Sequence, residues 1–264
     1  MSTAGIRFGT DGWRGLIAED FTEANAAVVV QAAAAAWADA EGGPGRPLVV
    51  GYDTRFNSRR VADLAAAILA ANGWRVLLAD RPVPTPAVSF AVTDRGAAGG
   101  LVVTASHNPA RFNGIKLKGP FGGSATPEFT TRVEAALGVT PPREPSGADR
   151  ARIEVTDLLP AYLDRIRSRV ALGHRRARPL RIVADALHGA TNGLFASLVP
   201  PAWGEVRLLH AAPDPLFGGL HPEPIPPHVD ALSAEVRRTG ADFGVAMDGD
   251  GDRLGLVAGD GSYV

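Results

Sequence analysis

The sequence predicts an α/β protein made of two consecutive three-layer domains, each with a mainly parallel mixed sheet. Short apolar runs alternate with stretches of helical period along nearly the whole chain. Residues 138–152 interrupt this alternation with proline, glycine and charge, so they are the best linker candidate. Two predicted strands, one on each side of that stretch, end in polar, reactive sequences. We therefore expect one domain at residues 1–140 and another at 153–264.

The first series of elements is marked by helix-start signals and short apolar strands. Capping residues, or proline in the first helical turn, stand at Asp20 with Glu23, Ser58, Thr85-Pro86 and Thr126-Pro127. Each signal precedes a helix, the last of them ending near residue 137. The apolar runs predict strands at 48–51, 76–78 and 101–104.

The second series follows the same alternation. Helical patterns cover about 158–170, the region around 194 and 229–238, and strands are expected at 182–184, 206–209, 243–247 and 254–257. Asp260-Gly261 is a hairpin-turn signal. The late hairpin predicts an antiparallel edge on an otherwise parallel sheet.

Composition excludes several classes of protein. The chain has 264 residues, of which 45% are hydrophobic and 21% charged, as in ordinary soluble domains. A net charge of -1 argues against nucleic-acid or membrane partners. The absence of cysteine excludes disulfides and thiolate sites, and is compatible with the cytoplasm, where we place the protein. We expect no signal peptide, and the apolar stretch 26–38 is shorter than the ~20 residues that span a membrane.

The strand at 101–104 runs into Ser106, which is followed by His107, Asn108 and Pro109. A serine in a tight turn at a strand end can present its hydroxyl to a ligand, because ligands gather beyond the carboxyl ends of parallel strands. Ser, Asn and Pro are also ordinary turn residues. Taken alone, this segment favours a plain turn.

The strand at 243–247 ends at Asp248, Asp250 and Asp252, which alternate with glycine. Carboxylates so spaced can converge on one hard cation, and three like charges behind an apolar strand repel unless a cation offsets them. A solvated acidic turn is the alternative, and we favour metal binding.

Two other acidic-loop families do not fit. An EF-hand loop needs glycine and glutamate where this chain has Arg253 and Gly259. A haloacid-dehalogenase-type phosphatase needs further motifs downstream, and only 12 residues follow Asp252.

Five segments resemble the α-D-phosphohexomutases, the phosphoglucomutase and phosphomannomutase superfamily. They are RFGTDGWRG at 7–15, TASHNP at 104–109, NGIKLKGPFGG from 113, PDPLFGGLHPEP from 213 and DGDGDR at 248–253. The segments occur in the family's order across essentially the whole chain. The resemblance implies interconversion of hexose 1-phosphate and hexose 6-phosphate through hexose 1,6-bisphosphate.

The resemblance also implies roles for particular residues. Ser106 would carry the phosphate, and a phosphoserine oxygen would join Asp248, Asp250 and Asp252 as ligands of Mg²⁺. Lys116 would be the general base, Arg14 and His107 would hold the transferring phosphoryl group, and Arg253 would support the phosphoserine or the metal loop. Two plainer interpretations stay open: Lys116 as a phosphate contact or solvated lysine, and His107 as a turn residue. We expect Ser106 and the aspartates to lie on separate domains and to meet across a cleft.

The resemblance covers only the first two of the family's four domains. No Gly-Glu-x-Ser-Gly sugar loop or Arg-x-Ser-Gly-Thr phosphate loop is found, so we expect a fragment whose partners are the missing C-terminal domains. Such a fragment would bind Mg²⁺ with little turnover. The alternative is a non-catalytic metal- or partner-binding protein that retains the fold. Trp13 favours the glucose/mannose branch over the glucosamine branch, but the sugar stays open.

Overall fold

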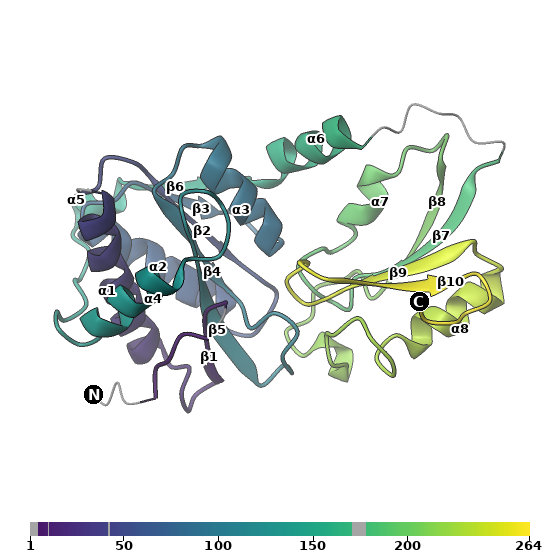
Figure 1. The fold of residues 1–264 in the computed structure, drawn as a ribbon, viewed down its shortest axis with the longest axis horizontal. Coiled ribbons are helices and arrows are strands. Elements are labelled where there is room, and N and C mark those ends of the chain that lie inside the picture. The colour runs from purple at the N-terminus through teal and green to yellow at the C-terminus, as the bar shows by residue number, and fades with distance from the viewer. Residues whose placement is uncertain (1–4, 10, 42, 171–177) are drawn as a thin grey trace. The chain divides into compact units, whose positions relative to one another are not determined.

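The computed structural model describes residues 5–9, 11–41, 43–170 and 178–264. By their contacts, the described residues form two compact units (Figure 1). The first unit holds residues up to 53, then 57–105 and 111–158. The second holds 159–264 together with two short segments, 54–56 and 106–110. Thr10, within one of the family-like segments, lies outside the described residues.

The first unit is built on a six-stranded sheet with the order β1-β5-β4-β2-β3-β6. Strands β2, β3, β4 and β6 are parallel to one another, whereas β5 runs antiparallel to both β4 and β1. The strand bounds are β1 Trp13–Leu16, β2 Leu48–Tyr52, β3 Val76–Ala79, β4 Gly99–Val103, β5 Phe112–Lys118 and β6 Ile153–Thr156.

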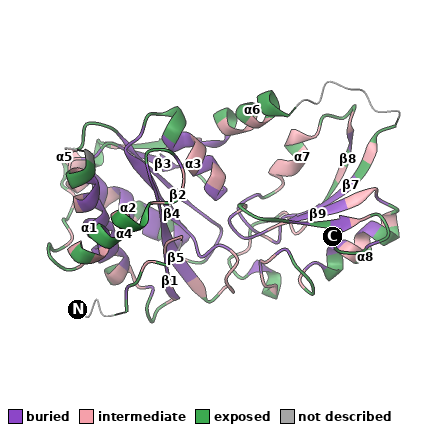
Figure 2. Ribbon diagram, in the orientation of Figure 1, coloured by how far each residue is buried: buried purple, intermediate pink, exposed green. Residues whose placement is uncertain are grey.

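Helices cover both faces of this sheet. Their bounds are α1 Glu23–Glu41, α2 Ser58–Ala71, α3 Thr85–Asp94, α4 Pro127–Ala136 and α5 Gly147–Arg150. A Cβ added at Gly99 would meet the Trp37 ring of α1, whereas one added at Gly100 would meet Val88 and Val92 of α3. Because successive strand residues face opposite sides, α1 and α3 lie on opposite faces. The first unit therefore has three layers, and β2, β3 and β4 between them are buried throughout (Figure 2).

The second unit has a four-stranded sheet with the order β10-β9-β7-β8. Strands β7, β8 and β9 are parallel, and β10 pairs antiparallel with β9, which confirms the predicted antiparallel edge. The bounds are β7 Leu180–Asp185, β8 Gly204–Leu209, β9 Phe243–Met247, β10 Leu254–Ala258, α6 Leu159–Arg169, α7 Leu194–Leu198, η1 Phe217–Gly219 and α8 Asp230–Thr239. Helix α8 packs Leu232 and Val236 against Gly244 of β9. Two α/β units with mixed, mostly parallel sheets confirm the predicted fold class.

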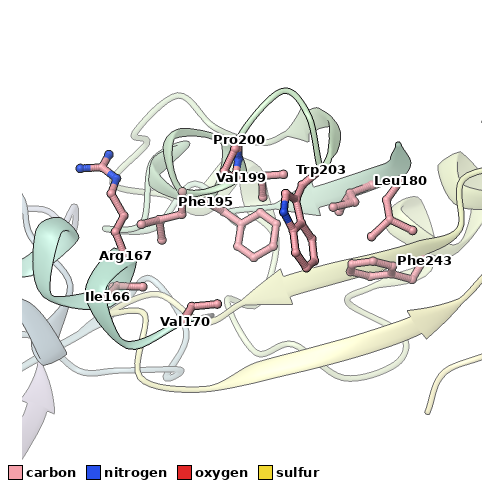
Figure 3. Close-up of a pocket in the computed structure, with 11 residues that line it drawn as sticks. Ile166, Arg167, Val170, Leu180, Phe195, Val199, Pro200, Trp203 and Phe243 are labelled. Carbon is pink, nitrogen blue, oxygen red and sulfur yellow. The ribbon is translucent and has the colours of Figure 1, made fainter. Parts of the chain in front are cut away.

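The other face of the second sheet holds an apolar hollow of about 290 Å³ (Figure 3). Side chains from α6, α7, β7 and β9 line it, among them Ile166, Phe195, Ile182 and Phe243. None of the predicted site residues contributes to it, so the candidate site lies elsewhere.

Several local predictions need correction. Helix α1 is capped by Thr22, whose Oγ1 accepts from the Asn25 N–H at 3.1 Å, rather than by a capping box at Asp20. Ser58 does not cap α2, because its hydroxyl donates instead to Asp53 at 2.8 Å. The cap at Thr126 is confirmed.

Some elements fall where the sequence predicts none. The expected linker at 138–152 contains α5, and the strand that follows it, β6, pairs with β3. Strands β1 and β5 were also not predicted. Among the described residues, no helix is both long and apolar enough to cross a bilayer.

The close approach of α3 to β2 depends on Gly51. A Cβ at this position would lie 2.3 Å from Cγ2 of Val88, so we expect Gly51→Ala to destabilise the chain by about 1–3 kcal/mol. At Gly45, an added Cβ would meet no atom of the described residues within 4 Å apart from its chain neighbours, so Gly45→Ala serves as the matched control. Urea unfolding would measure both variants, and equal stability of Gly51→Ala and Gly45→Ala would contradict this packing.

Candidate functional site

The loop between β9 and β10 folds around the side chain of Asp248. Oδ1 of Asp248 accepts from the backbone N–H groups of Asp252 and Arg253, at 3.0 and 3.1 Å. The turn closes through the N–H of Gly251, which donates to the Asp248 carbonyl at 3.0 Å and has a φ of 68°. Glycine adopts this left-handed conformation without steric cost, so the loop can turn sharply behind the strand.

Three carboxylates converge in this loop. One oxygen from each of Asp248, Asp250 and Asp252 lies within 4.8 Å of the others, and the first two residues are fully buried. Burial, followed by the charges of Asp250 and Asp252, raises the pKa of Asp248 to about 8. An all-oxygen donor set under mutual repulsion fits a hard divalent cation such as Mg²⁺.

Ser106 follows β4 and lies against this loop. Its side chain is buried, and its Oγ donates to Oδ2 of Asp248 at 3.1 Å. Its φ of 54° is in the left-handed region, which costs free energy for a residue with a Cβ and is a frequent feature of functional sites. The segment 106–110 belongs by its contacts to the same compact unit as the aspartates. By their contacts, the serine and the carboxylates therefore lie in the same compact unit.

Gly249 lets the two loops approach closely. A Cβ at this position would lie 2.6 Å from the carbonyl oxygen of Ser106. Any larger residue would push the loops apart, so the glycine between the first two aspartates is required by packing.

Arg55 holds the backbone of the serine loop and was missed by the sequence analysis. Its guanidinium donates to the carbonyls of Ser106, Asn108 and Pro109 at 2.7, 2.6 and 2.9 Å. The same group lies 4.8 Å from the ring centroid of Phe217, a cation–π contact. Arg55 follows β2, the parallel neighbour of β4, so the strand-end rule that singled out Ser106 could also have found it.

His107 lies between Arg253 and Glu223. Nη1 of Arg253 is 2.7 Å from Nδ1 of His107, and a guanidinium can only donate. Nδ1 is therefore the acceptor, and the proton of a neutral His107 ring lies on Nε2. That nitrogen faces a carboxylate oxygen of Glu223 at 4.0 Å.

Arg14 and Lys116 belong to the first unit. Lys116, on β5, is buried, and its Nζ pairs with Oδ2 of Asp11 at 2.9 Å. Burial favours a higher pKa for Asp11, but Lys116 and the Ser124 hydroxyl outweigh it and lower the pKa overall. Arg14, on β1, has a buried Nε with no hydrogen-bond partner among the described residues.

Known protein families match both parts of the chain. The phosphoglucomutase/phosphomannomutase alpha/beta/alpha domain I matches residues 5–140, and domain II of the same family matches 160–261. The phosphoglucosamine mutase of Rhodococcus opacus (strain B4) is 35% identical, over 98% of this chain and 58% of that protein. That of Frankia casuarinae is 36% identical, over 97% of this chain and 57% of that protein.

Solved structures agree with this match. A Thermus thermophilus protein assigned as a phosphomannomutase superposes with a TM-score of 0.90 and 34% identity, over 99% of this chain and 59% of its own. A phosphoglucomutase/phosphomannomutase family protein of Burkholderia thailandensis superposes with a TM-score of 0.85 and 27% identity, over 100% of this chain and 56% of its own. The chain spans somewhat more than half the length of these relatives. From the two domain matches in order, we conclude that the chain belongs to the phosphoglucomutase/phosphomannomutase family.

Proposed function

We propose that this chain supplies the phosphate-carrying serine and the metal-binding loop of a phosphohexomutase. The observation that carries the proposal is the hydrogen bond from Ser106 Oγ to Asp248, inside a cluster of three carboxylates. Sugar-selecting loops would come from further domains, as the greater length of the relatives supports.

The reaction would transfer a phosphoryl group from phosphorylated Ser106 to a hydroxyl of a hexose monophosphate. The Ser106 Oγ–P bond breaks, a bond forms between phosphorus and the sugar oxygen, and the hydroxyl proton passes to a base. The hexose 1,6-bisphosphate then returns its other phosphate to Ser106, which completes the isomerisation. Little covalent chemistry is asked of the protein beyond positioning and charge neutralisation.

Asp248, Asp250 and Asp252 would hold Mg²⁺ together with an oxygen of phosphorylated Ser106. When bound, Mg²⁺ supplies positive charge that offsets the negative charge of the transferring phosphoryl group. His107 and Arg253 already lie against each other in the unit that holds Ser106, so together they can present donors to phosphate oxygens. Arg14 would add a third donor.

Lys116 is the proposed base, and its ion pair with Asp11 constrains that role. A carboxylate at 2.9 Å favours the ammonium form, which cannot accept a proton. Lys116 must therefore pass its proton to Asp11 before it accepts one from the sugar hydroxyl. The pair thus provides two groups through which that proton can move.

The sugar is proposed from the relatives. Phosphoglucosamine mutases at 35% and 36% identity make glucosamine phosphate the first substrate to test. Glucose or mannose phosphate is the second, because Trp13 and the likeness to the Thermus protein favour that branch.

Incubation of the chain with Mg²⁺ and hexose or hexosamine 1,6-bisphosphate should place phosphate on Ser106. Ser106→Ala should abolish incorporation, because no other hydroxyl is hydrogen-bonded to Asp248 in the described structure. Ser168→Ala is the control, since this exposed serine of α6 donates its hydroxyl to the Arg165 carbonyl at 2.7 Å. Mass spectrometry would locate the phosphate, and phosphate on another residue would refute the assignment of Ser106.

Mg²⁺ should stabilise the chain more at high pH than at low pH. The pKa of Asp248 is raised from 3.8 to about 8, so the folded state binds this proton more tightly than the unfolded state. The resulting stabilisation is complete below pH 3.8 and is lost as pH rises through about 8. Mg²⁺ competes with that proton, so its binding should raise Tm more at a pH above 8 than near pH 5.

Asp250→Asn is the control for this pH dependence. The substitution removes one proposed metal ligand and one negative charge, so it should reduce the Mg²⁺-induced rise in Tm at both pH values. A Tm increase that is the same at both pH values in the unaltered chain would contradict metal binding at these carboxylates.

Arg55→Lys should slow phosphate transfer to Ser106 by on the order of 10²-fold, because an ammonium group cannot hold three carbonyls as the guanidinium does. The Mg²⁺ affinity of the unphosphorylated chain should change little, since the three carbonyls that Arg55 holds belong to the backbone of the serine loop and the ligands are then the three aspartates. Arg59→Lys, at an exposed ion pair with Asp63, is the matched control. Rate and Mg²⁺ affinity that fall together would indicate a general loss of structure instead of a loss of positioning.

A further inference from the structure

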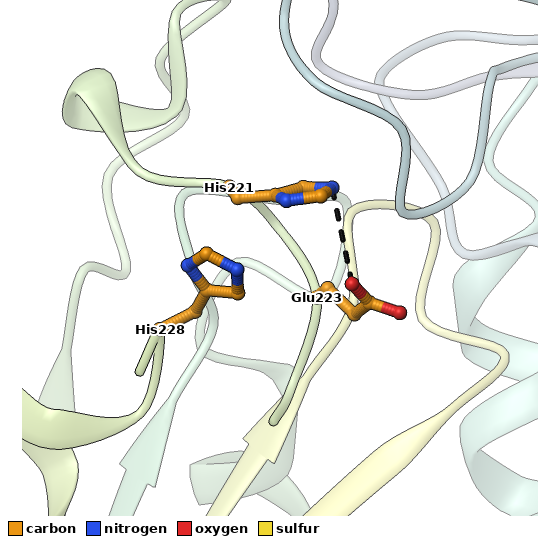
Figure 4. A group of neighbouring side chains, drawn as sticks. All are labelled: His221, Glu223 and His228. Carbon is orange, nitrogen blue, oxygen red and sulfur yellow. Dashed lines mark ion pairs between the residues drawn. The ribbon is translucent and has the colours of Figure 1, made fainter. Parts of the chain in front are cut away.

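A second group of metal-ligating side chains lies in the second unit outside the aspartate loop. His221, Glu223 and His228 each offer one ligand atom, and these atoms lie within 4.8 Å of one another (Figure 4). All three residues are half-buried. They stand in the segment between η1 and α8, and the proposed phosphoryl transfer uses none of them.

Tight turns bring the three side chains together. The N–H of Glu223 donates to the His221 carbonyl at 2.8 Å, and the N–H of His228 donates to the Ile225 carbonyl at 2.8 Å. The His221 and His228 rings lie 4.7 Å apart between centroids, tilted by 59°. The Pro222 carbonyl accepts from the N–H of Gly249 at 3.2 Å, which attaches this segment to the aspartate loop.

One nitrogen of the His221 ring, Nε2, faces Glu223 (Figure 4). This nitrogen is buried and has no hydrogen-bond partner among the described residues. The nearest carboxylate oxygen of Glu223 is 3.9 Å away, beyond hydrogen-bond range. A buried nitrogen without a partner costs free energy, and a bound cation would remove that cost.

The ligand types distinguish this group from the aspartate loop. Two imidazoles and one carboxylate suit Zn²⁺ and similar transition metals, whereas Mg²⁺ prefers oxygen alone. Two donors on one tetrahedral Zn²⁺ lie about 3.3 Å apart, given metal–ligand bonds of about 2.0–2.1 Å. Donors within 4.8 Å of one another reach that spacing if each moves inward by less than about 1 Å, a small side-chain rotation.

We propose that His221, Glu223 and His228 bind a divalent transition-metal ion of the Zn²⁺ class, at a site separate from the aspartate loop. Three protein ligands leave a fourth position for water or an anion. Glu223 also lies 4.0 Å from Nε2 of His107, so one ligand of the proposed ion is next to the Ser106 loop. The site thus connects transition-metal binding to the environment of His107.

Cobalt titration of the full chain tests the site, because Co²⁺ bound to imidazole absorbs visible light and substitutes for Zn²⁺. Asp250→Asn is used as the background, so that the aspartate loop contributes little to the signal. We expect saturable binding of one ion per chain in Asp250→Asn. Adding His228→Gln should weaken that binding by more than about tenfold. The single variant His228→Gln should keep the Mg²⁺-induced rise in Tm.

Equal Co²⁺ affinity with and without His228→Gln, or no saturable Co²⁺ signal in Asp250→Asn, would overturn the proposal. If His228→Gln fails to fold, Glu223→Gln gives the same comparison with a side chain of nearly the same size. As an independent readout, Zn²⁺ should shift the ring NMR signals of His221 and His228 in Asp250→Asn. Ring signals that do not move at saturating Zn²⁺ would equally refute the site.

Discussion

The carboxylate of Asp248 is the acceptor on which the candidate site depends. One oxygen binds two backbone N–H groups of its own loop, and the other binds the hydroxyl of Ser106. Those contacts fix the shape of the loop and the place of the serine together. This arrangement has an electrostatic free-energy cost, because burial and two neighbouring aspartates oppose ionisation of Asp248. A bound divalent cation would offset that cost, at the place where the proposed phosphate transfer needs positive charge.

Residues that bear no reactive group make this arrangement possible. Gly249 permits the backbone of one loop to lie against the carbonyl of Ser106, and Arg55 gathers three carbonyls of the other loop. Because Ser106 has a positive φ, its loop needs such external support to persist. The segments that carry Arg55 and Ser106 both group by their contacts with the second unit, although each follows a strand of the first.

Much of the fold and of the candidate site could be predicted from the sequence, wherever a local sequence pattern agrees with the final structure. The apolar runs of the parallel strands and the alternating aspartates are local patterns, so they were found. Strand β5 was missed because it carries Lys116 and Lys118, which are buried against Asp11 and break any apolar pattern. The place of Arg55 after β2 could have been found by the strand-end rule, but its carbonyl partners are distant in sequence and only the folded chain brings them to it. The His221 group was missed because its members are irregularly spaced.

If the proposed function holds, phosphate on Ser106 and a metal ion in the aspartate loop are neighbours. Mn²⁺ in place of Mg²⁺ tests this directly, because its unpaired electrons broaden the ³¹P NMR signal of a nearby phosphate. On chain phosphorylated at Ser106, Mn²⁺ should broaden the phosphoserine signal severely, and Asp250→Asn should restore much of it. A phosphoserine signal that stays sharp at saturating Mn²⁺ would contradict the account.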